Sequence, residues 1–281
     1  MRGIAVLRLL RPEQWTKNLL VMAPWVFAGL TGSRELGLSA LAAAMLFAAA
    51  SSMVYVFNDY IDSESDRVHP VKRFTRPIAS GAVTPLTAFA VGVILFFLVL
   101  SGAVSFPALR LPLAAFVVVN LLYTTVLKHL PVLDLITVAS GYLIRVYAGA
   151  VAVGVPLSVW MGSTTVFLSL FLVSSKRYVE LSRGELGGRG VLSSYSPGFL
   201  NVFHWAAGVA TLACYLSFVL LVRPRLLGTI PLVVVGLARY AWLTQSLTKS
   251  ESPSDVLLED GPLLLAVIAW SVLALMLVPG G

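Results

Sequence analysis

Residues 58–67 read NDYIDSESDR and close a long apolar stretch of the chain. Asp59, Asp62 and Asp66 follow one another at intervals of three and four residues, so a helix through this segment carries all three carboxylates on one face. Three like charges on one face repel each other unless a cation lies among them. Oxygen ligands suit Mg²⁺, which proteins usually share with the phosphates of a substrate. The segment therefore predicts a Mg²⁺ site made by these three aspartates.

Basic residues follow the acidic segment directly, at Lys72, Arg73 and Arg76. An acidic helix end next to a basic loop matches the charges of a magnesium–diphosphate complex, so we expect these three side chains to bind phosphate. The alternative is that they only set the orientation of the chain in a membrane. Asn58 is expected either to contact the metal or a phosphate, or to cap the helix.

The whole chain is too apolar for a water-soluble protein. Of its 281 residues, 58% are hydrophobic and only 12% are charged, so there are too few charges to cover a soluble surface. We predict an all-α integral membrane protein, with a single transmembrane catalytic domain over residues 1–281. The apolar runs predict nine transmembrane helices, near residues 17–31, 36–57, 83–104, 111–127, 131–152, 157–175, 203–222, 228–247 and 262–279. The alternative is eight spans, with the first run lying partly in the membrane interface.

Positive charge predicts the orientation. With the N-terminus in the cytoplasm, fourteen of the twenty Lys and Arg residues lie in cytoplasmic segments, four lie outside, and Arg145 and Arg239 lie within spans. Membrane proteins show this cytoplasmic excess, so we expect a multi-pass protein of the cell (inner) membrane, with its N-terminus and active site cytoplasmic and its C-terminus outside. The net charge of +7 indicates lipid head groups or anionic substrates as partners, and not nucleic acid. A homo-oligomer is compatible with the sequence.

Polar residues concentrate in two predicted cytoplasmic loops, 58–82 and 176–202, which we expect to form the polar cap of the active site. A transporter would instead place its polar groups near the bilayer midplane. Arg145 is an exception because it falls within a span, where a charge costs about 2.5–3.5 kcal/mol on insertion scales. We expect its guanidinium to face a cavity or a partner and to act in catalysis, with Tyr142 one helical turn before it as a substrate contact.

The second loop begins with Lys176, Arg177 and Tyr178, and Glu180 follows. Their spacing allows both basic residues to pair with Glu180 along a helix. The other interpretation is that this group binds an anionic substrate. Asp134, at the start of the span that contains Arg145, is either a charge at a helix end or part of the site.

The N-terminal segment reads LRPEQWTKN over residues 10–18. Trp15 with basic neighbours is typical of an anchor in the membrane interface. In an α-helix, however, Arg11, Gln14 and Asn18 would share a face, and Lys17 would lie at the membrane edge, where it can reach a lipid phosphate. Both interpretations remain open on the residues alone.

The order of these motifs resembles that of the UbiA-type membrane prenyltransferases. The resemblance rests on Asn-Asp-x-x-Asp-x-x-x-Asp from Asn58, on Lys-Arg-x-x-Arg-Pro-Ile-Ala-Ser-Gly from Lys72, and on Gly-x-x-x-Arg-x-x-Ala-Gly from Gly141. Members of that family have nine transmembrane helices around a central cavity that opens to the cytosol. The resemblance covers essentially the whole chain and implies the same arrangement here.

Most members of that family carry a second Asp-rich motif after the sixth span, where this chain has Lys176-Arg177-Tyr178-x-Glu180. This substitution, together with residues 11–18 and Val256-Leu257-Leu258, is similar to one branch of the family. That branch transfers 5-phosphoribose from phosphoribosyl diphosphate to a polyprenyl (decaprenyl) phosphate, releases diphosphate, and makes a lipid-linked precursor of cell-wall arabinan. The alternative is an ordinary prenyltransferase that moves a prenyl group from its diphosphate to an aromatic or other acceptor. A transporter or lipid-binding protein without catalysis is a third interpretation.

The resemblance to this branch implies a division of roles. Asp59, Asp62 and Asp66 hold Mg²⁺ against the departing diphosphate, and an ionised lipid phosphate held by Lys17 attacks C1 of the ribose, so that no protein general base is needed. Asp59, Asp62, Lys17 and Arg145 are then the catalytic residues. The expected substrate-binding residues are Arg11, Asn18, Asn58, Asp66, Lys72, Arg73, Arg76, Tyr142, Lys176, Arg177, Tyr178 and Glu180.

Overall fold

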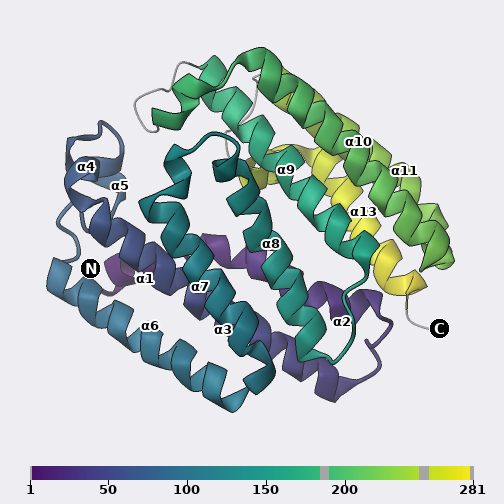
Figure 1. The fold of residues 1–281 in the computed structure, drawn as a ribbon, viewed down its shortest axis with the longest axis horizontal. Coiled ribbons are helices and arrows are strands. Elements are labelled where there is room, and N and C mark those ends of the chain that lie inside the picture. The colour runs from purple at the N-terminus through teal and green to yellow at the C-terminus, as the bar shows by residue number, and fades with distance from the viewer. Residues whose placement is uncertain (1, 184–189, 247–252, 279–281) are drawn as a thin grey trace. The chain divides into compact units, whose positions relative to one another are not determined.

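The structure, a computed structural model, describes residues 2–183, 190–246 and 253–278, which form helices joined by loops with no β-strand among them (Figure 1). Seven helical stretches in this part of the chain are long and apolar enough to cross a membrane, and an eighth apolar helix, α13 (Gly261–Leu277), is shorter. The predicted all-α membrane fold is thus confirmed.

The chain forms two compact units. The first unit comprises Met1–Pro24, Arg34–Thr125 and Ile144–Val155, and the second comprises Trp25–Ser33, Val126–Leu143 and Pro156–Gly281. Helix α8 (Leu133–Ala152) gives its first half to the second unit and its second half to the first.

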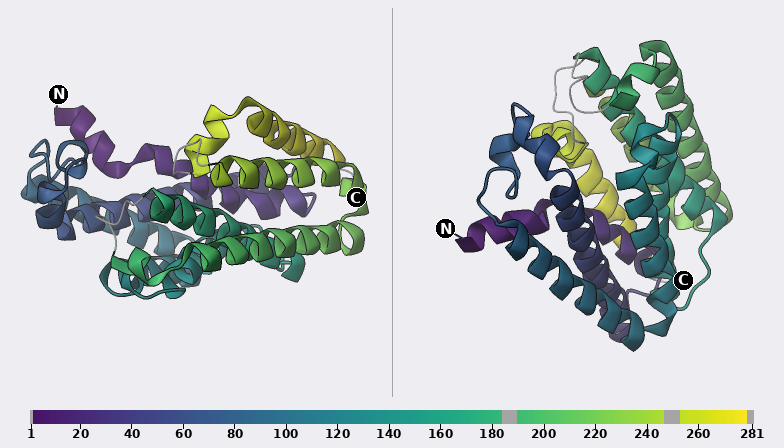
Figure 2. Two further views of the ribbon diagram at one scale, coloured as in Figure 1. Left: turned by 90° about the horizontal axis from the view of Figure 1, so that it is seen from above. Right: turned by 60° about the vertical axis from the view of Figure 1, so that its left-hand side comes forward.

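The first unit is built around one long helix, α3 (Arg34–Ile61), which packs against η1, α6, α7 and α1 (Figures 1 and 2). Its 28 residues extend over about 42 Å at 1.5 Å per residue. The other helices of this unit are α1 (Arg2–Leu10), η1 (Pro12–Met22), α4 (Ser63–Val68), α5 (Lys72–Thr75), α6 (Pro85–Ser105), η2 (Pro107–Leu109) and α7 (Arg110–Thr125).

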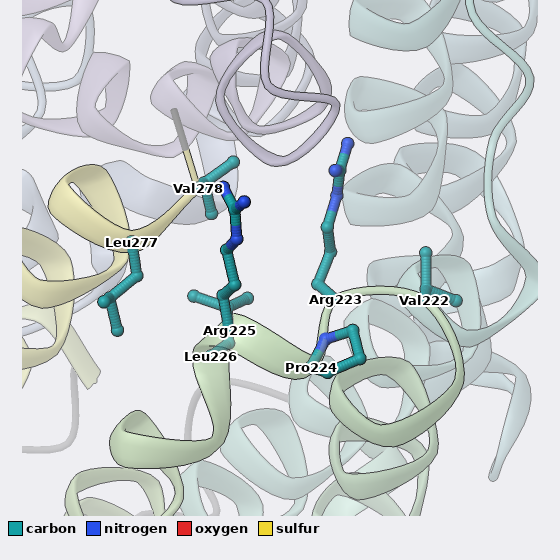
Figure 3. A pocket seen from close by; sticks show the side chains of 7 residues that line it. All are labelled: Val222, Arg223, Pro224, Arg225, Leu226, Leu277 and Val278. Carbon is teal, nitrogen blue, oxygen red and sulfur yellow. The ribbon is translucent and has the colours of Figure 1, made fainter. Parts of the chain in front are cut away.

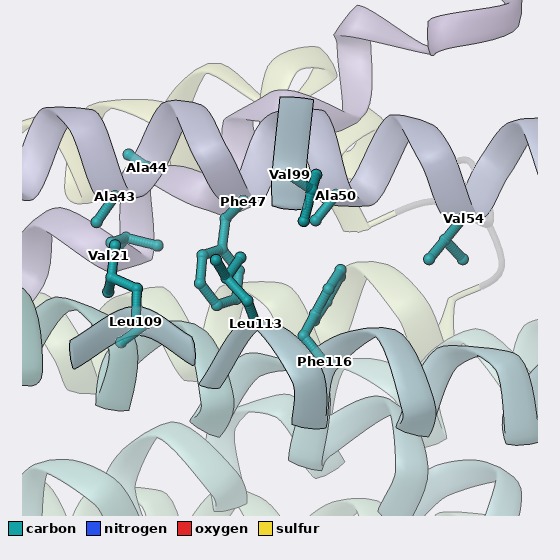
Figure 4. Close-up of a cluster of buried hydrophobic side chains, with 11 residues drawn as sticks. Val21, Ala43, Ala44, Phe47, Ala50, Val54, Val99, Leu109, Leu113 and Phe116 are labelled. Atoms are coloured by element: carbon teal, nitrogen blue, oxygen red, sulfur yellow. The ribbon is translucent and has the colours of Figure 1, made fainter. Parts of the chain in front are cut away.

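Small residues on α3 allow its neighbours to approach closely. Ala43, Ala44 and Ala50 are buried in one apolar cluster with larger side chains from α3, α6 and α7 (Figure 4). In this cluster, the rings of Phe47 and Phe116 pack with their centroids 5.3 Å apart. Small side chains at helix interfaces are the usual means of packing in membranes, because there is no hydrophobic effect between helices in lipid.

The second unit consists mainly of α9 (Val159–Ser182), which packs along α10 (Pro197–Leu221), and α11 (Ile230–Gln245), which packs on α13. Its shorter elements are α2 (Ala23–Phe27, shared with the first unit at its first two residues), η3 (Leu127–His129), η5 (Gly190–Ser194), η6 (Pro224–Thr229) and α12 (Pro253–Glu259). A pocket of about 170 Å³ lies at the turn from α10 into η6 (Figure 3). One of its lining residues, Arg223, donates from Nε to the carbonyl oxygen of Phe27 at 2.8 Å, which ties this turn to the end of α2.

Three of the apolar helices begin with a side-chain cap and carry a proline in their first turn. Thr84, Ser196 and Asp260 each accept a hydrogen bond from the backbone N–H three residues later, at the starts of α6, α10 and α13. A cap satisfies one of the N–H groups that a helix leaves open, and a proline in the first turn loses no hydrogen bond there. These starts are therefore fixed by local sequence.

Eight of the nine predicted spans are helices at the expected places. The first predicted span, 17–31, is not a single helix: it consists of η1 and the five-residue α2. Pro12 begins η1 after a left-handed residue, and Pro24 lies in α2. The prediction of nine crossings is therefore not matched by nine long helices among the described residues.

Residues 12–22 form a 3₁₀-helix of 11 residues, which is unusually long for this conformation. Its three-residue repeat places Trp15, Asn18 and Val21 on one edge, and Asn18 and Val21 are buried. The expectation that Arg11, Gln14 and Asn18 share an α-helical face is therefore wrong, because this segment lacks the α-helical repeat.

The acidic segment is also interrupted. Helix α3 ends at Ile61, α4 begins at Ser63, and Asp62 lies in the turn between them. The i→i−4 backbone bonds nevertheless continue, since the Asp62 N–H donates to Asn58 at 2.9 Å and the Asp66 N–H donates to Asp62 at 2.8 Å. The assumption of one continuous helix is wrong at Asp62, although the local register is kept.

Candidate active site

Asp59 is the best-buried carboxylate of the acidic segment. It lies in the last turn of α3 and is 3% exposed. Its Oδ1 accepts hydrogen bonds from the guanidinium of Arg11 and, at 2.8 Å, from that of Arg76. Its Oδ2 is buried and has no hydrogen-bond partner within the described part of the chain. Since a buried carboxylate oxygen normally has a partner, this atom is a candidate ligand for a cation.

Arg11 reaches Asp59 from an unusual backbone conformation. It lies between α1 and η1 with φ 52° and ψ 60°, the left-handed region that non-glycine residues rarely adopt. Its guanidinium also lies 4.8 Å from the centre of the Tyr55 ring, in a cation–π contact. Strained residues of this kind concentrate at binding and catalytic sites. The conformation turns the chain so that α1 and η1 both lie against α3.

The other residues of the acidic segment have separate partners. Asp66 is 4% exposed and pairs with Lys72 Nζ at 3.3 Å. Asn58 Oδ1 accepts a hydrogen bond of 2.5 Å from the hydroxyl of Thr124, while Asp62 lies half-buried at the turn. In the described ranges, no three Asp, Glu, His or Cys side chains gather closely enough to hold a metal ion by themselves. Any cation here would take further ligands from water or from a substrate as well as from the protein.

Arg145 has buried polar partners, as the sequence predicts. Its Nε donates to Asn18 Oδ1 at 2.8 Å, and its Nη2 lies 3.3 Å from the hydroxyl oxygen of Ser51. Its guanidinium also lies 4.6 Å from the centre of the Phe116 ring. The side chain is 6% exposed. Asn18 is 2% exposed, and its Nδ2 has no partner within the residues described.

Three further residues predicted to contact substrate are half-buried or exposed. Lys17 is half-buried on η1, and Arg73 is exposed, with its guanidinium 4.5 Å from the centre of the Phe74 ring. Tyr142 is half-buried on α8, one turn before Arg145. Their predicted substrate contacts stay predictions.

The second unit contains a buried ion cluster. Arg177 donates from Nε to Asp134 Oδ2 at 3.0 Å and from Nη1 to Glu180 Oε2 at 2.8 Å, and both Asp134 and Arg177 are almost fully buried. Lys176 Nζ lies 3.7 Å from Glu180 Oε1 and is more exposed. The predicted pairing of the two basic residues with Glu180 along a helix is thus confirmed, while their predicted binding of a substrate stays a prediction.

Tyr195 completes this cluster. Its hydroxyl donates to Asp134 Oδ1 and accepts a 2.7 Å hydrogen bond from the backbone N–H of Val132. Burial and the hydrogen bond to Asp134 raise the pKa of Tyr195 above its usual value, so the hydroxyl keeps its proton. Val132 has φ 68°, which is unfavourable for a β-branched residue. The cluster therefore fixes the loop before α8 to the segment before α10.

Tyr178 lies on the apolar side of α9. It packs against a buried cluster that includes Val173, Val191 and Leu200. Residues 184–189, within the predicted loop 176–202, lie outside the described residues.

Several contacts could not be found from the sequence. Ser51, Ser52 and Thr124 carry no motif, and they join the site only because α3, η1 and α7 pack together. Tyr195 gave no signal either, since its partner Asp134 is 61 residues away.

Comparison with known proteins agrees with this architecture. Residues 19–257 match the UbiA prenyltransferase family, which is most of the chain. The chain belongs to this family.

Relatives of this UbiA family member include curated enzymes of one kind. Decaprenyl-phosphate phosphoribosyltransferase of Mycobacterium tuberculosis is 37% identical over 279 residues, which cover 94% of this chain and 91% of the relative. The protein of the same name from Mycolicibacterium smegmatis is 38% identical over 219 residues, which cover 75% of this chain and 68% of the relative.

Solved structures share the fold of this UbiA family member. A UbiA homolog from Archaeoglobus fulgidus, bound to GPP and Mg²⁺, aligns with a TM-score of 0.74 and 19% identity over 98% of this chain and 96% of the homolog. Digeranylgeranylglyceryl phosphate synthase aligns with a TM-score of 0.72 and 15% identity over 99% of both chains. At these identities the similarity concerns the fold alone.

Proposed function

We propose that the chain transfers 5-phosphoribose from phosphoribosyl diphosphate to a polyprenyl phosphate, such as decaprenyl phosphate, and releases diphosphate. The observation that carries the proposal is the Asp59 carboxylate, with one oxygen held by Arg11 and Arg76 and the other buried with no partner among the described residues. The curated relatives, 37–38% identical, support a phosphoribosyl group as the group transferred and decaprenyl phosphate as the acceptor.

The residues present fit a divalent cation. The unpartnered Oδ2 of Asp59 is a hard anionic ligand, and Asp62 and Asp66 lie on the next turns. Mg²⁺ commonly takes one or two carboxylates and completes its octahedral shell with water and substrate phosphates. We propose Asp59, Asp62 and Asp66 as its protein ligands, which would hold it only together with the donor's phosphate oxygens; when bound it would neutralise charge that builds up on the diphosphate.

The basic residues around Asp59 would position the donor. Arg76 and Lys72 already pair with Asp59 and Asp66, so they lie within reach of a diphosphate held at these carboxylates. Arg73, which is exposed, and Asn58 would add contacts to the phosphate oxygens. As the bond between C1 and the diphosphate oxygen breaks, the diphosphate leaves with the electron pair and the ribose becomes oxocarbenium-like.

The acceptor would be a lipid phosphate held by Lys17 and Arg11. One of its anionic oxygens forms the new bond to C1, so no proton has to be removed and no general base is needed. Arg145 and Asn18 would hold η1, and with it Lys17, in place. Catalysis would then arise from positioning and electrostatics.

The donor also carries a 5-phosphate, for which we propose the cationic group at the end of α9. Lys176 is the most exposed member of this group, whereas Arg177 would reach a ligand only by leaving Asp134 or Glu180. Tyr178, Glu180 and Tyr142 complete the proposed contacts. We place these groups at the cytoplasmic face of the inner membrane, in a single catalytic domain.

Substitution of Asp59 by Asn tests the proposal. The purified protein in detergent would receive radiolabelled phosphoribosyl diphosphate, decaprenyl phosphate and Mg²⁺, and lipid-extractable product would be counted with and without EDTA. We expect an EDTA-sensitive product and a loss of about 100-fold or more in Asp59→Asn, as for removal of one electrostatic stabiliser of a transition state.

The matched control is Glu64→Gln, which removes a carboxylate charge at an exposed position of α4. It should retain the wild-type rate. No product from the wild-type protein, together with activity on a prenyl diphosphate and an aromatic acceptor, would instead make the chain an ordinary prenyltransferase.

A further inference from the structure

The pocket at the turn from α10 into η6 contains two arginines that have no part in the candidate active site. Arg223 and Arg225 line its cavity of about 170 Å³, together with Pro224 and apolar side chains of this turn and of the end of α13 (Figure 3). All the lining residues belong to the second unit. The described residues that line the pocket include no carboxylate, so the charge of its lining is positive.

Positive charge is scarce at this end of the helices. Only four of the twenty Lys and Arg residues lie in segments predicted to be outside, and Arg223 and Arg225 are two of these four. Membrane proteins concentrate Lys and Arg in their cytoplasmic segments. A pair of arginines two residues apart at the opposite end therefore requires a local reason.

Arg223 is held in a fixed position. Its Nε donates to the carbonyl oxygen of Phe27 at 2.8 Å, and this is its one hydrogen bond within the described part of the chain. A Cβ built on Gly29, which has φ 79°, would lie 3.6 Å from Arg223 Nη2, so the guanidinium packs close to the loop after α2. A guanidinium has five N–H donors. The two Nη groups therefore present a fork of donors that suits two oxygens of a phosphate.

The second guanidinium stands on the same rigid base. Arg225 is exposed and extends from η6 in the same direction as Arg223 (Figure 3). Leu226 is fully buried and Val278 is 3% exposed, and both belong to one apolar cluster beneath the two arginines. The base of the pocket is thus formed by packed side chains, and the pocket is already shaped before any anion binds.

Exposed apolar side chains surround the pocket. In a chain that crosses a membrane, such side chains contact acyl chains, so the pocket lies where hydrocarbon meets head groups. Basic pockets between transmembrane helices bind anionic lipid head groups. Drug-sized ligands need pockets of about 300–1,000 Å³, so this smaller pocket suits a head-group phosphate, with the acyl chains outside it. The exposed apolar residues are Leu220, Leu221, Val222, Leu227, Leu275 and Met276.

Arginines at a membrane edge can also act only as anchors, with their charged groups in water. An anchor needs neither a preformed cavity nor a guanidinium fixed to the backbone of another segment. Arg223 has both, through the pocket and through Phe27. These two observations favour a binding site over an anchor.

We propose that this pocket binds the phosphate of an anionic glycerophospholipid of the bilayer, such as phosphatidylglycerol. The phosphate lies between Arg223 and Arg225, and the acyl chains lie along the exposed apolar residues of α10 and α13. In the predicted orientation this lipid belongs to the outer leaflet, and it is neither a substrate nor a product of the proposed transfer. Since the pocket joins the loop after α2, the turn into η6 and the end of α13, the bound lipid stabilises the second unit.

Native mass spectrometry of the purified protein in detergent, titrated with phosphatidylglycerol, tests the proposal. We expect the Kd for phosphatidylglycerol to rise about tenfold or more in Arg225→Gln, because hydrogen bonds to a charged group contribute at least the free energy of one power of ten. Arg225 is exposed, so this variant should fold. Phosphatidylcholine, whose head group has no net charge, should bind the wild-type protein about tenfold more weakly or less.

The matched control is Arg34→Gln, which removes an exposed positive charge on the same predicted side, at the start of α3 in the first unit. It should leave the Kd for phosphatidylglycerol unchanged. The same Kd in Arg225→Gln and in the wild type would overturn the proposal. Equal Kd values of the wild type for phosphatidylglycerol and phosphatidylcholine would also overturn it, because the arginines would then make no selection by charge.

Thermal unfolding in detergent separates a lipid from a soluble anion. Added phosphatidylglycerol should raise the Tm of the wild type and of Arg34→Gln, since a ligand of the folded state stabilises it, and should not raise the Tm of Arg225→Gln. An equal rise with inorganic phosphate or glycerol 3-phosphate at the same concentration would make the pocket a site for soluble anions and overturn the lipid assignment. None of these measurements involves phosphoribosyl transfer, so failure of the proposed function would leave their result unaffected.

Discussion

At the scale of single residues, Arg145 joins α8 to the N-terminal segment. Its guanidinium bonds to Asn18 and lies beside Ser51, in the interior of the first unit. In Arg145→Met, the carbonyl oxygen of the buried Asn18 amide would lose its charged donor. We expect the free energy of unfolding to fall by about 1.5–3 kcal/mol, the usual range for hydrogen bonds to a charged group. The measurement is thermal unfolding of the purified protein in detergent.

Arg73→Met is the control for Arg145→Met, because Arg73 is exposed and its guanidinium stacks on Phe74. It should change the free energy of unfolding by about 0.5 kcal/mol or less. Arg145→Lys would keep the charge without the forked geometry, and full stability in that variant would show that charge alone is required.

At the scale of elements, the contact between η1 and α8 depends on a glycine. A Cβ at Gly149 would collide with the carbonyl oxygen of Val21, which belongs to the backbone and cannot turn away. We expect Gly149→Ala to lower the free energy of unfolding by about 1–3 kcal/mol through overpacking. Thermal unfolding in detergent would measure this change.

The comparison is Gly92→Ala on α6. A Cβ there would meet only a methyl group of Val56 at 3.6 Å, an ordinary contact. Since alanine is the better helix former, this variant should be neutral or more stable by up to about 1 kcal/mol. Equal effects of the two substitutions would mean that η1 does not lie against α8.

At the scale of the whole molecule, the charge bias predicts which ends of α3 and α6 face the cytoplasm. Cys214 is the only cysteine of the chain, so Cys214→Ser gives a background for single labels. Ser65→Cys lies in α4 and Ser105→Cys at the end of α6, and both positions are exposed. We expect a membrane-impermeant maleimide to label Ser105→Cys on intact cells and Ser65→Cys only after the membrane is opened. Labelling of Ser65→Cys on intact cells, with Ser105→Cys labelled only after the membrane is opened, would contradict this orientation and support the inverted one.

Much of the fold could be predicted because the lengths of the apolar runs and the residues that cap helices are visible in the sequence. Eight helices lie where apolar runs were found, and Thr84, Ser196 and Asp260 mark three of their starts. The conformation of residues 12–22 could not be predicted, since a 3₁₀-helix forms there through packing on α3 and not through propensity.

The candidate site was predictable in its residue types but not in its pairings. Clustered carboxylates and a buried arginine are visible in the sequence as charges among apolar residues. Which groups they bind depends on distant packing: Arg11 and Asp59 are 48 residues apart, and Asn18 and Arg145 are 127 apart. The αL conformation of Arg11, before a proline that disfavours α conformations for the preceding residue, has no sequence signal.

Because η1 repeats every three residues, a change in the length of the N-terminal segment alters which edge of η1 its side chains occupy, unless the change is a multiple of three residues. Deletion of one residue between Trp15 and Asn18 would rotate one side of the segment by about 120° relative to the other. Trp15 and Asn18 could then no longer meet Ser52 and Ser51 together. Deletion or insertion of three residues would change the reach by about 6 Å but keep every edge in phase. Over evolutionary time, this segment would accept changes in length only as multiples of three residues.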